Sequence, residues 1–200
     1  MLKVALTGGI ATGKSHVLEQ FRLHGIPCLD ADVLARGVTA PGTEAAEAIA
    51  ARFGPGVMDA DGAIDRKALG ALVFEDEAAR RALEAIVHPA VYRSIVAGLR
   101  AFELMGGAPL AIVDVPLLYE TGHEKDFDRV ILTTCPVAIQ VERLVRRGLT
   151  RSEAQRRIDA QLPTEAKASR ADFVIRTDGS FDETNQQVDE VLGRLANLRI

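Results

Sequence analysis

One stretch near the amino terminus decides the fold, and it reads Gly8-Gly9-Ile10-Ala11-Thr12-Gly13-Lys14-Ser15. This stretch matches the whole of the phosphate-binding pattern G-x-x-x-x-G-K-[ST]. It lies between an apolar run at residues 2–7 and a helical pattern at residues 14–21, which is the strand–loop–helix context that the pattern requires. Glycines let the backbone curl around phosphate oxygens with its N–H groups pointing inward. The sequence therefore predicts a site for a nucleoside triphosphate.

The residue types that close the stretch suit the chemistry of a triphosphate. Lys14 places a positive charge at the β- and γ-phosphates, and the Ser15 hydroxyl is a ligand for Mg²⁺. The helix that begins at Lys14 adds the positive end of its dipole. We therefore expect the nucleotide to be bound by a continuous set of residues, Gly9, Ile10, Ala11, Thr12, Gly13, Lys14, Ser15 and His16.

Composition excludes several other classes of protein. The 200 residues suit one compact domain, and the net charge of -4 predicts no attraction to nucleic acid or to an anionic membrane. Cys28 and Cys135 lie in or beside apolar runs, and without a C-x-x-C pair we expect buried, reduced thiols. No leader-like segment is visible, and no apolar run approaches the ~20 residues of a membrane span. We therefore expect a cytoplasmic protein.

Short apolar runs alternate with helical patterns along the chain. The runs are rich in Val, Ile and Leu, and they occupy residues 2–7, 27–29, 110–115, 130–133 and 173–175. This alternation predicts an α/β fold of the P-loop NTPase type, in which helices cover both faces of a parallel five-stranded sheet. The last segment, residues 182–198, has apolar positions at helical spacing and is expected to pack back on the core.

Two helical insertions interrupt this alternation. The first has helical patterns at residues 45–53, 66–74, 77–87 and 90–104, with predicted breaks at 41–42, 54–56, 88–89 and 106–107. The second, residues 136–170, is rich in Arg and Gln and polar enough to project as a lid. We predict one domain over residues 1–200, in which the core takes residues 1–32, 108–135 and 171–200, a helical second-substrate region takes 33–107, and the lid takes 136–170.

Two acidic motifs follow predicted strands, at the sheet edge where such folds place their chemistry. Asp30 and Asp32 come after the second strand, where a carboxylate can accept a proton from an attacking hydroxyl or can cap the next helix. We expect both roles to be filled, with Asp32 at the substrate. Asp114 ends the third strand and resembles a Walker-B aspartate that holds Mg²⁺ through water, although a simple turn residue fits equally well.

Basic residues gather in the predicted lid. Gln140, Arg143 and Arg147 have the spacing i, i+3, i+7 and share one helical face, from which arginines can reach the transferring phosphoryl group. We interpret the other arginines of this segment as a solvated face, namely Arg146, Arg151, Arg156 and Arg157. His88 precedes Pro89 at a predicted helix break, and it suits a turn as well as a substrate contact.

Taken together, these motifs resemble the dephospho-CoA kinase family over nearly the whole chain. The matching elements are the loop, Asp30-Ala31-Asp32 with Ala35-Arg36, His88-Pro89, Pro116-Leu117-Leu118 with Glu120, Gln140 with Arg143 and Arg147, Gln161, and Ala171-Asp172-Phe173-Val174-Ile175. The resemblance implies ATP-dependent phosphorylation of the ribose 3′-hydroxyl of dephospho-CoA with Mg²⁺, by a monomer or weak homo-oligomer. It implies a nucleotide core, a helical CoA-binding region and a lid.

The resemblance also implies roles for individual residues. Asp32 becomes the catalytic base, and Arg143 becomes a phosphate-contacting lid residue that acts with Lys14 in catalysis. The acceptor side takes Asp32, Arg36, His88, Leu117, Leu118 and Glu120. The chain departs from the family pattern at His16, where a threonine is common, and at Arg176-Thr177-Asp178, which leaves the base selectivity open.

Two rival functions fit part of the pattern. A nucleoside or nucleoside-monophosphate kinase shares the loop, the lid and the acceptor layout, but the long helical insertion favours a larger acceptor. A GTPase switch is disfavoured because the chain has no Asn-Lys-x-Asp motif and no Asp-x-x-Gly after the third predicted strand.

Overall fold

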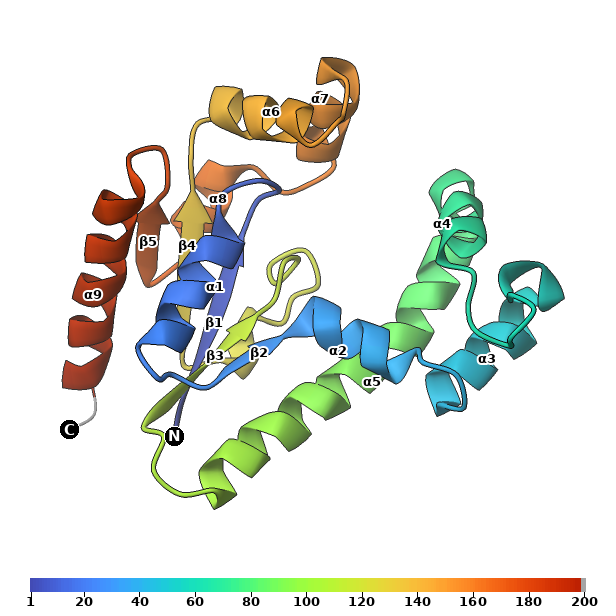
Figure 1. Cartoon of the computed structure of the whole chain (residues 1–200), viewed down its shortest axis with the longest axis horizontal. Coiled ribbons are helices and arrows are strands. Elements are labelled where there is room, and N and C mark those ends of the chain that lie inside the picture. Colours follow the sequence, from blue (N-terminus) through green and yellow to red (C-terminus); the bar gives the residue numbers. More distant parts are fainter. Residues whose placement is uncertain (199–200) are drawn as a thin grey trace. The chain divides into compact units, whose positions relative to one another are not determined.

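The computed structural model describes residues 1–198 and builds its core on a five-stranded sheet in the order β2-β3-β1-β4-β5 (Figure 1). The strands are β1 Leu2–Gly8, β2 Cys28–Asp30, β3 Leu110–Asp114, β4 Arg129–Thr134 and β5 Phe173–Arg176. β1 pairs in parallel with β3 and β4, and β4 pairs in parallel with β5. The predicted α/β fold with a five-stranded sheet is thus confirmed. The predicted core extends to residue 200, and residues 199–200 lie outside the described part.

The central strand β1 explains why the loop lies at the middle of the sheet edge. Val4, Ala5 and Leu6 are fully buried because both faces of a central strand are covered. In the ladder, Leu6 pairs with Asp114 of β3 and Gly8 pairs with Thr133 of β4. The carboxyl ends of the three strands therefore meet directly beneath the phosphate-binding stretch.

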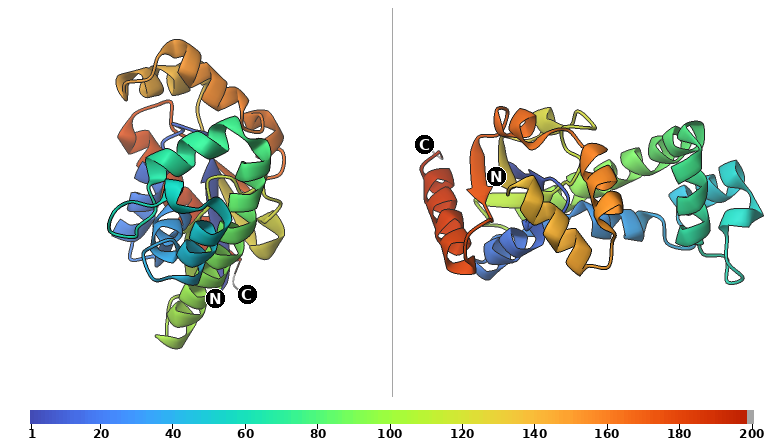
Figure 2. Two further views of the ribbon diagram at one scale, coloured as in Figure 1. Left: turned by 90° about the vertical axis from the view of Figure 1, so that its right-hand side faces the viewer. Right: turned by 90° about the horizontal axis from the view of Figure 1, so that it is seen from above.

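Helices α1 Lys14–Leu23 and α9 Phe181–Asn197 lie side by side along one face of the sheet (Figure 1). Their apolar stripes join β-strand side chains in the main core, which contains Val17, Phe21, Val188, Val191 and Leu195. The prediction that the last segment packs back on the core is confirmed. The segment that follows β4 forms α6 Val137–Arg146, α7 Arg151–Asp159 and α8 Thr164–Ala168, with α6 and α7 in contact (orange in Figure 2).

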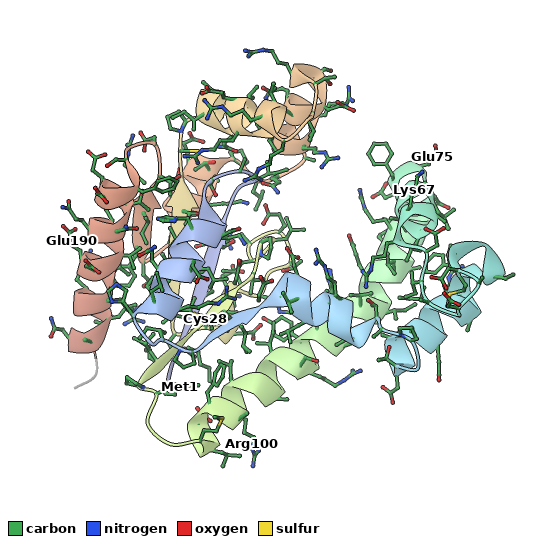
Figure 3. The ribbon with its side chains drawn as sticks, in the orientation of Figure 1. Met1, Cys28, Lys67, Glu75, Arg100 and Glu190 are labelled. Atoms are coloured by element: carbon green, nitrogen blue, oxygen red, sulfur yellow. The ribbon has the colours of Figure 1, made fainter. Side chains whose placement is uncertain are left out.

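Residues 30–101 form a second compact unit, which is helical. It holds α2 Ala31–Val38, α3 Glu44–Phe53, the 3-10 turn η1 Pro55–Val57, α4 Arg66–Glu75 and most of α5 Glu77–Leu104. Lys67 and Glu75, both labelled in Figure 3, lie on α4. Ile49, Val57 and Leu69 form the unit's own apolar core. The helical insertion predicted between the second and third strands is therefore present.

The predicted helix break at His88-Pro89 is wrong, because α5 continues through both residues. A proline inside a helix removes one backbone hydrogen bond and costs about 3 kcal/mol. Here Pro89 and Ala85, whose carbonyl loses its partner, are both exposed, so water can bond that carbonyl. Buried residues further along the helix, such as Ile95 and Leu99, keep it folded against its neighbours. His88 is thus a half-buried helical residue and not a turn residue.

Both cysteines are free thiols; Cys135 is buried, as predicted, whereas Cys28 is only half-buried. Burial raises the pKa of Cys28, which lies on β2 (Figure 3), to about 11, and burial also raises the pKa of Cys135. Neither thiol is therefore poised as a nucleophile near neutral pH. None of the helices in residues 1–198 combines the length and the apolar character needed to cross a bilayer.

Candidate functional site

The phosphate-binding stretch forms a tight loop between the end of β1 at Gly8 and the start of α1 at Lys14. Gly13 has a φ of 81° in the left-handed region, which favours glycine. At Gly8 a Cβ atom would lie 2.2 Å from the Thr133 hydroxyl oxygen, so a side chain is excluded by close approach. Ala11 also has a positive φ, 60°, although it is not glycine. The loop is therefore strained at Ala11 and must be held by its surroundings.

Hydrogen bonds inside the loop fix its curvature. The Thr12 hydroxyl donates to the Gly9 carbonyl at 2.8 Å, and it lies 2.9 Å from the Thr133 hydroxyl of β4. The Gly13 carbonyl accepts from the His16 N–H at 3.1 Å, as the first turn of α1 requires. The N–H groups that open a helix have no partner within it, so this end of α1 can bind an anion.

Lys14 and Asp114 form an ion pair at the mouth of the loop. The Lys14 side chain is 15% exposed and the Asp114 side chain is 5% exposed. Two largely buried charges of opposite sign neutralise each other, which lowers the cost of keeping them out of water. The pair places both predicted charged residues of the nucleotide site in direct contact at the carboxyl edge of the sheet.

Ser15 and Asp114 supply the oxygen ligands that Mg²⁺ prefers. Ser15 lies exposed in the first turn of α1, and Asp114 ends the neighbouring strand β3. Within residues 1–198, no group of three or more His, Cys, Asp or Glu side chains could hold a metal ion by itself. This donor set fits Mg²⁺, which usually keeps several waters and takes its other ligands from substrate phosphates.

Arg143 reaches the loop from the lid helix α6. Its Nη1 donates to the Ala11 carbonyl at 3.0 Å, and its Nη2 donates to the Thr177 carbonyl at 2.5 Å. Arg147, the C-cap of α6, is exposed and makes no such contact in the described residues, while Gln140 is buried and donates to the Cys135 carbonyl at 3.2 Å. The structure thus brings Arg143, but not Arg147, to the phosphate loop.

His16 points away from the loop and toward α9. Its Nε2 lies 2.9 Å from Asn185 Oδ1, and its ring centroid lies 4.6 Å from that of Phe181. The His16 N–H is already used by the Gly13 carbonyl. The expected contact between His16 and the nucleotide is therefore not available to its side chain in this structure.

The loop after β3 carries the predicted acceptor residues Leu117, Leu118 and Glu120. Leu117 is exposed, whereas Leu118 is fully buried with Ala5 and Val130. A direct acceptor contact of the Leu118 side chain is therefore excluded in this arrangement, because the side chain is used in packing. Leu118 instead anchors the segment that presents Leu117.

Glu120 is bound by α8 and by the segment that leads into it. Its Oε1 forms an ion pair with Lys167 at 2.5 Å and accepts a hydrogen bond from the Leu162 N–H at 3.2 Å. Lys167 is only 1% exposed, which sequence analysis did not anticipate, since nothing in its local pattern distinguishes it from a surface lysine. Gln161, next to Leu162, accepts from the Ile10 N–H at 2.8 Å. This segment therefore contacts both the phosphate loop and the loop after β3.

A cavity of about 280 Å³ lies where the phosphate loop meets the lid. Gly9 lines it together with the amide side chains Gln140, Gln155 and Gln161. Its charged lining residues are Asp159 and Glu165, and no Lys or Arg contributes. The cavity therefore suits uncharged groups of a ligand, whereas the loop is better suited to bind phosphates.

The structure shows which of Asp30 and Asp32 caps the helix that follows β2. Asp30 is the N-cap of α2, because its Oδ1 accepts from the N–H groups of Asp32 at 2.9 Å and Val33 at 3.1 Å. Asp32 is exposed in the first turn of α2, and Arg36 is exposed in the last turn. Capping therefore does not require the Asp32 carboxylate.

The segment after β5, which departs from the family pattern, has hydrogen bonds between its own side chains. Arg176 donates to Asp178 through Nη2 at 2.7 Å and Nε at 3.2 Å, which lowers the pKa of the Asp178 carboxyl. Thr177 between them is buried and faces the phosphate loop. Sequence analysis had singled out this segment only for base selectivity and missed its contact with the loop.

Comparison with known proteins agrees with this geometry. The family model described as dephospho-CoA kinase matches residues 2–183. Dephospho-CoA kinase from Anaeromyxobacter dehalogenans is 49% identical over 98% of this chain and 92% of its own length. A Thermus thermophilus crystal structure aligns with a TM-score of 0.83 and 36% identity over 97% of both chains. Dephospho-CoA kinase from Campylobacter jejuni aligns with a TM-score of 0.74 and 26% identity over 99% of this chain and 98% of its own. The chain therefore belongs to the dephospho-CoA kinase family.

Proposed function

We propose that this chain transfers the γ-phosphoryl group of ATP to the ribose 3′-hydroxyl of dephospho-CoA, giving CoA and ADP. The observation that carries the proposal is the complete phosphate loop, with Lys14 paired to Asp114, in a chain whose family match spans residues 2–183. The alternative of a nucleoside or nucleoside-monophosphate kinase is not favoured, because the matched family is defined by the larger acceptor.

On the nucleotide side, the N–H groups at the start of α1 and the Lys14 ammonium bind the β- and γ-phosphates. Lys14 leaves Asp114 for the phosphates when ATP enters, since the triphosphate offers it more negative charge. The ATP-binding set is Gly9, Ile10, Ala11, Thr12, Gly13, Lys14 and Ser15, with His16 contributing only as part of the α1 turn. Ile10 belongs to this set as part of the loop; its N–H donates to Gln161 Oε1 at 2.8 Å and must exchange that partner before it can donate to a phosphate oxygen.

We assign the Mg²⁺ site to Ser15 as a direct ligand and to Asp114 through a water molecule. When bound by these residues, Mg²⁺ would supply positive charge to offset the negative charge on the phosphate oxygens during transfer. Asp114 becomes available for this role as its partner Lys14 turns to the phosphates. The arrangement therefore couples binding of the metal to binding of the nucleotide.

On the acceptor side, Asp32 is the general base. Its carboxylate accepts the proton of the 3′-hydroxyl as the hydroxyl oxygen bonds to the γ-phosphorus, and the bond from the γ-phosphorus to the bridging oxygen breaks to release ADP. Arg36 and His88 suit the anionic pyrophosphate of dephospho-CoA, and Leu117 supplies apolar contact. Glu120 belongs to the same side, with its Oε1 held by Lys167.

Arg143 contributes positive charge from the lid. Arginines that contact a transferring phosphoryl group are worth roughly 10³–10⁵ in rate. The contact of Arg143 with the Ala11 carbonyl supports this role, whereas Arg147 would require movement of the end of α6. We further propose a cytoplasmic monomer or weak homo-oligomer that binds neither nucleic acid nor membrane, which the net charge of -4 and the free thiols support.

An assay of ADP release tests the acceptor. Dephospho-CoA should be phosphorylated with far higher kcat/KM than AMP, CMP or adenosine. His88→Ala should raise KM for dephospho-CoA and spare KM for ATP, the sign of a lost acceptor contact. His24→Ala is the matched control, because His24 pairs with Asp189 of α9 outside the acceptor region. A higher kcat/KM with AMP or CMP than with dephospho-CoA would instead identify the chain as a nucleotide kinase.

A further inference from the structure

Thr177 is a buried hydroxyl residue directly after β5, and none of the roles assigned above uses its side chain. Its backbone continues the sheet, since its N–H donates to the Thr134 carbonyl at 2.9 Å. Its side chain lies against the phosphate loop, where a Cβ atom at Gly13 would approach Thr177 Cβ and Oγ1 to 3.1 Å. Thr177 is thus packed directly on the left-handed turn of the loop.

The Thr177 hydroxyl makes its shortest hydrogen bond to the Thr12 carbonyl, at 2.7 Å. A hydroxyl has one proton to donate, and the Thr134 carbonyl is a longer alternative at 3.3 Å. The same oxygen accepts from Arg143 Nη1 at 3.2 Å. The hydroxyl therefore links the phosphate loop to the lid arginine.

The position of the Thr12 carbonyl decides where the next N–H points. In a trans peptide the C=O and N–H groups point in opposite directions, so a carbonyl held on the Thr177 side aims the Gly13 N–H away from it. Within residues 1–198 the Gly13 N–H donates to no protein acceptor. It is therefore one of the groups that the loop presents to an anion.

Arg143 holds the preceding carbonyl in the same way. Its Nη1 donates to the Ala11 carbonyl at 3.0 Å, and Ala11 is the residue with a φ of 60°. A non-glycine residue in this region is strained and persists where other contacts hold it. Two successive loop carbonyls, those of Ala11 and Thr12, are thus held from outside the loop by Arg143 and Thr177, and these two residues also contact each other.

We propose that Thr177 is a positioning residue of the nucleotide site, whose hydroxyl holds the phosphate loop in its anion-binding conformation through the Thr12 carbonyl and Arg143. The inference rests on the proposed nucleotide site but does not depend on the acceptor. Removal of the hydroxyl leaves the Thr12 carbonyl without this donor and frees Arg143 Nη1 to move. ATP binding should therefore weaken, because part of its binding free energy must then reorder the loop.

Thr177→Val and Thr177→Ser separate the hydroxyl from the shape of the side chain. Valine keeps the branched shape and loses the hydroxyl, whereas serine keeps the hydroxyl. The dissociation constant of Mg-ATP, measured by calorimetry, should rise about tenfold in Thr177→Val and stay within about twofold of wild type in Thr177→Ser, since one hydrogen bond is worth about 1 kcal/mol or more. In the kinase assay KM for ATP should rise with Thr177→Val, and KM for dephospho-CoA should not.

Thr184→Val is the matched control. Thr184 is equally buried, and its hydroxyl donates to the Ser180 carbonyl at 3.1 Å within the start of α9. This variant should bind Mg-ATP as wild type does. If Thr177→Val does not fold, Thr177→Ala takes its place in the comparison. Alanine also removes the hydroxyl, and it adds no methyl group in its place.

Wild-type Mg-ATP affinity in the folded hydroxyl-free variant would overturn the inference. Equal weakening of Mg-ATP binding in Thr177→Ser or Thr184→Val would also overturn it. If neither Thr177→Val nor Thr177→Ala folded, the inference would fail as well, because the hydroxyl would then be needed for the whole fold. Wild-type protein that binds Mg-ATP but does not phosphorylate dephospho-CoA would contradict the proposed function and leave the role of Thr177 intact.

Discussion

Lys14 and Asp114 neutralise each other at the edge of the sheet, with side chains only 15% and 5% exposed. One residue begins α1 and the other ends β3, so the pair joins the phosphate loop to the neighbouring strand. Two groups that we propose to bind the triphosphate and its metal ion are thus paired with each other. The pair gives Lys14 a structural role in addition to its proposed role in catalysis.

Lys14→Ala should therefore change two measurements. Phosphoryl transfer should fall by at least about 10³-fold, because the charge at the β- and γ-phosphates is lost. The free energy of unfolding should fall by about 1–3 kcal/mol, because the largely buried Asp114 carboxylate loses its cation. Kinase assays and denaturant unfolding report the two effects, with the exposed Lys125→Ala as control. Activity close to wild type would contradict the nucleotide-site assignment.

Asp30 and Asp32 should respond in opposite ways to substitution. Asp30→Ala should lower the free energy of unfolding by about 1 kcal/mol, because Asp30 caps α2. Asp32→Asn should leave stability nearly unchanged and reduce kcat strongly, because a carboxamide cannot accept the acceptor's proton. Thermal unfolding and steady-state kinetics on both variants decide the matter. A kcat for Asp32→Asn near that of wild type would remove Asp32 as the base.

Lys167→Met should destabilise the protein by about 2–4 kcal/mol. The substitution leaves the Glu120 carboxylate without its ion-pair partner, and Glu120 Oε2 is already buried without a hydrogen-bond partner in the described residues. Arg146→Ala breaks an exposed pair with Glu142 and should cost less than about 1 kcal/mol. Urea unfolding compares the two. Equal effects would show that the buried pair contributes no more than the exposed one.

Pro89→Ala should raise the free energy of unfolding by about 1–3 kcal/mol. Alanine restores the hydrogen bond to the Ala85 carbonyl, and this gain exceeds the loss from a more flexible unfolded chain. Thermal unfolding at several protein concentrations measures the change free of association effects. A lower melting temperature would mean that α5 is adapted to the proline.

The stability of α9 should depend on pH through Glu183. Hydrogen bonds from the Ser180 N–H and the Ser180 hydroxyl hold the pKa of the Glu183 carboxyl below 4.5. Because the folded chain favours the carboxylate, this contribution is present above pH 4.5 and is lost as pH falls through the lowered pKa. As the pH is lowered from 7 to 3, the melting temperature should decrease less steeply for Glu183→Gln than for wild type. If the melting temperatures of the two proteins changed in parallel with pH, Glu183 would not cause the pH dependence.

Local sequence patterns predicted the strands, the phosphate loop and the helical insertions, because each is encoded by neighbouring residues. The apolar run before Gly8 and the start of α1 at Lys14 both lie where the pattern indicated. The break at Pro89 was wrongly predicted, because the local cost of a proline is outweighed by burial of apolar residues on both sides of it, such as Ala79 and Ile95.

The parts of the site that sequence analysis missed depend on distant contacts. Lys167 looks like a surface lysine until Glu120 is placed beside it. Thr177 looks like a strand-end residue until the loop carbonyl of Thr12 is placed at its hydroxyl. The roles of Asp32, Arg36 and His88 remain predictions from the family pattern, which the kinetic experiments address.

The hydrogen bond between Thr177 and Thr12 joins residues that are 165 positions apart. The phosphate-binding motif is therefore synthesised well before the residue that we propose to hold it. Because closing so long a loop of chain is slow, we expect the motif to become ordered late in folding. A nascent chain that ends before β5 would carry the whole motif and still lack a formed nucleotide site. ATP would then stabilise only chains long enough to include Thr177.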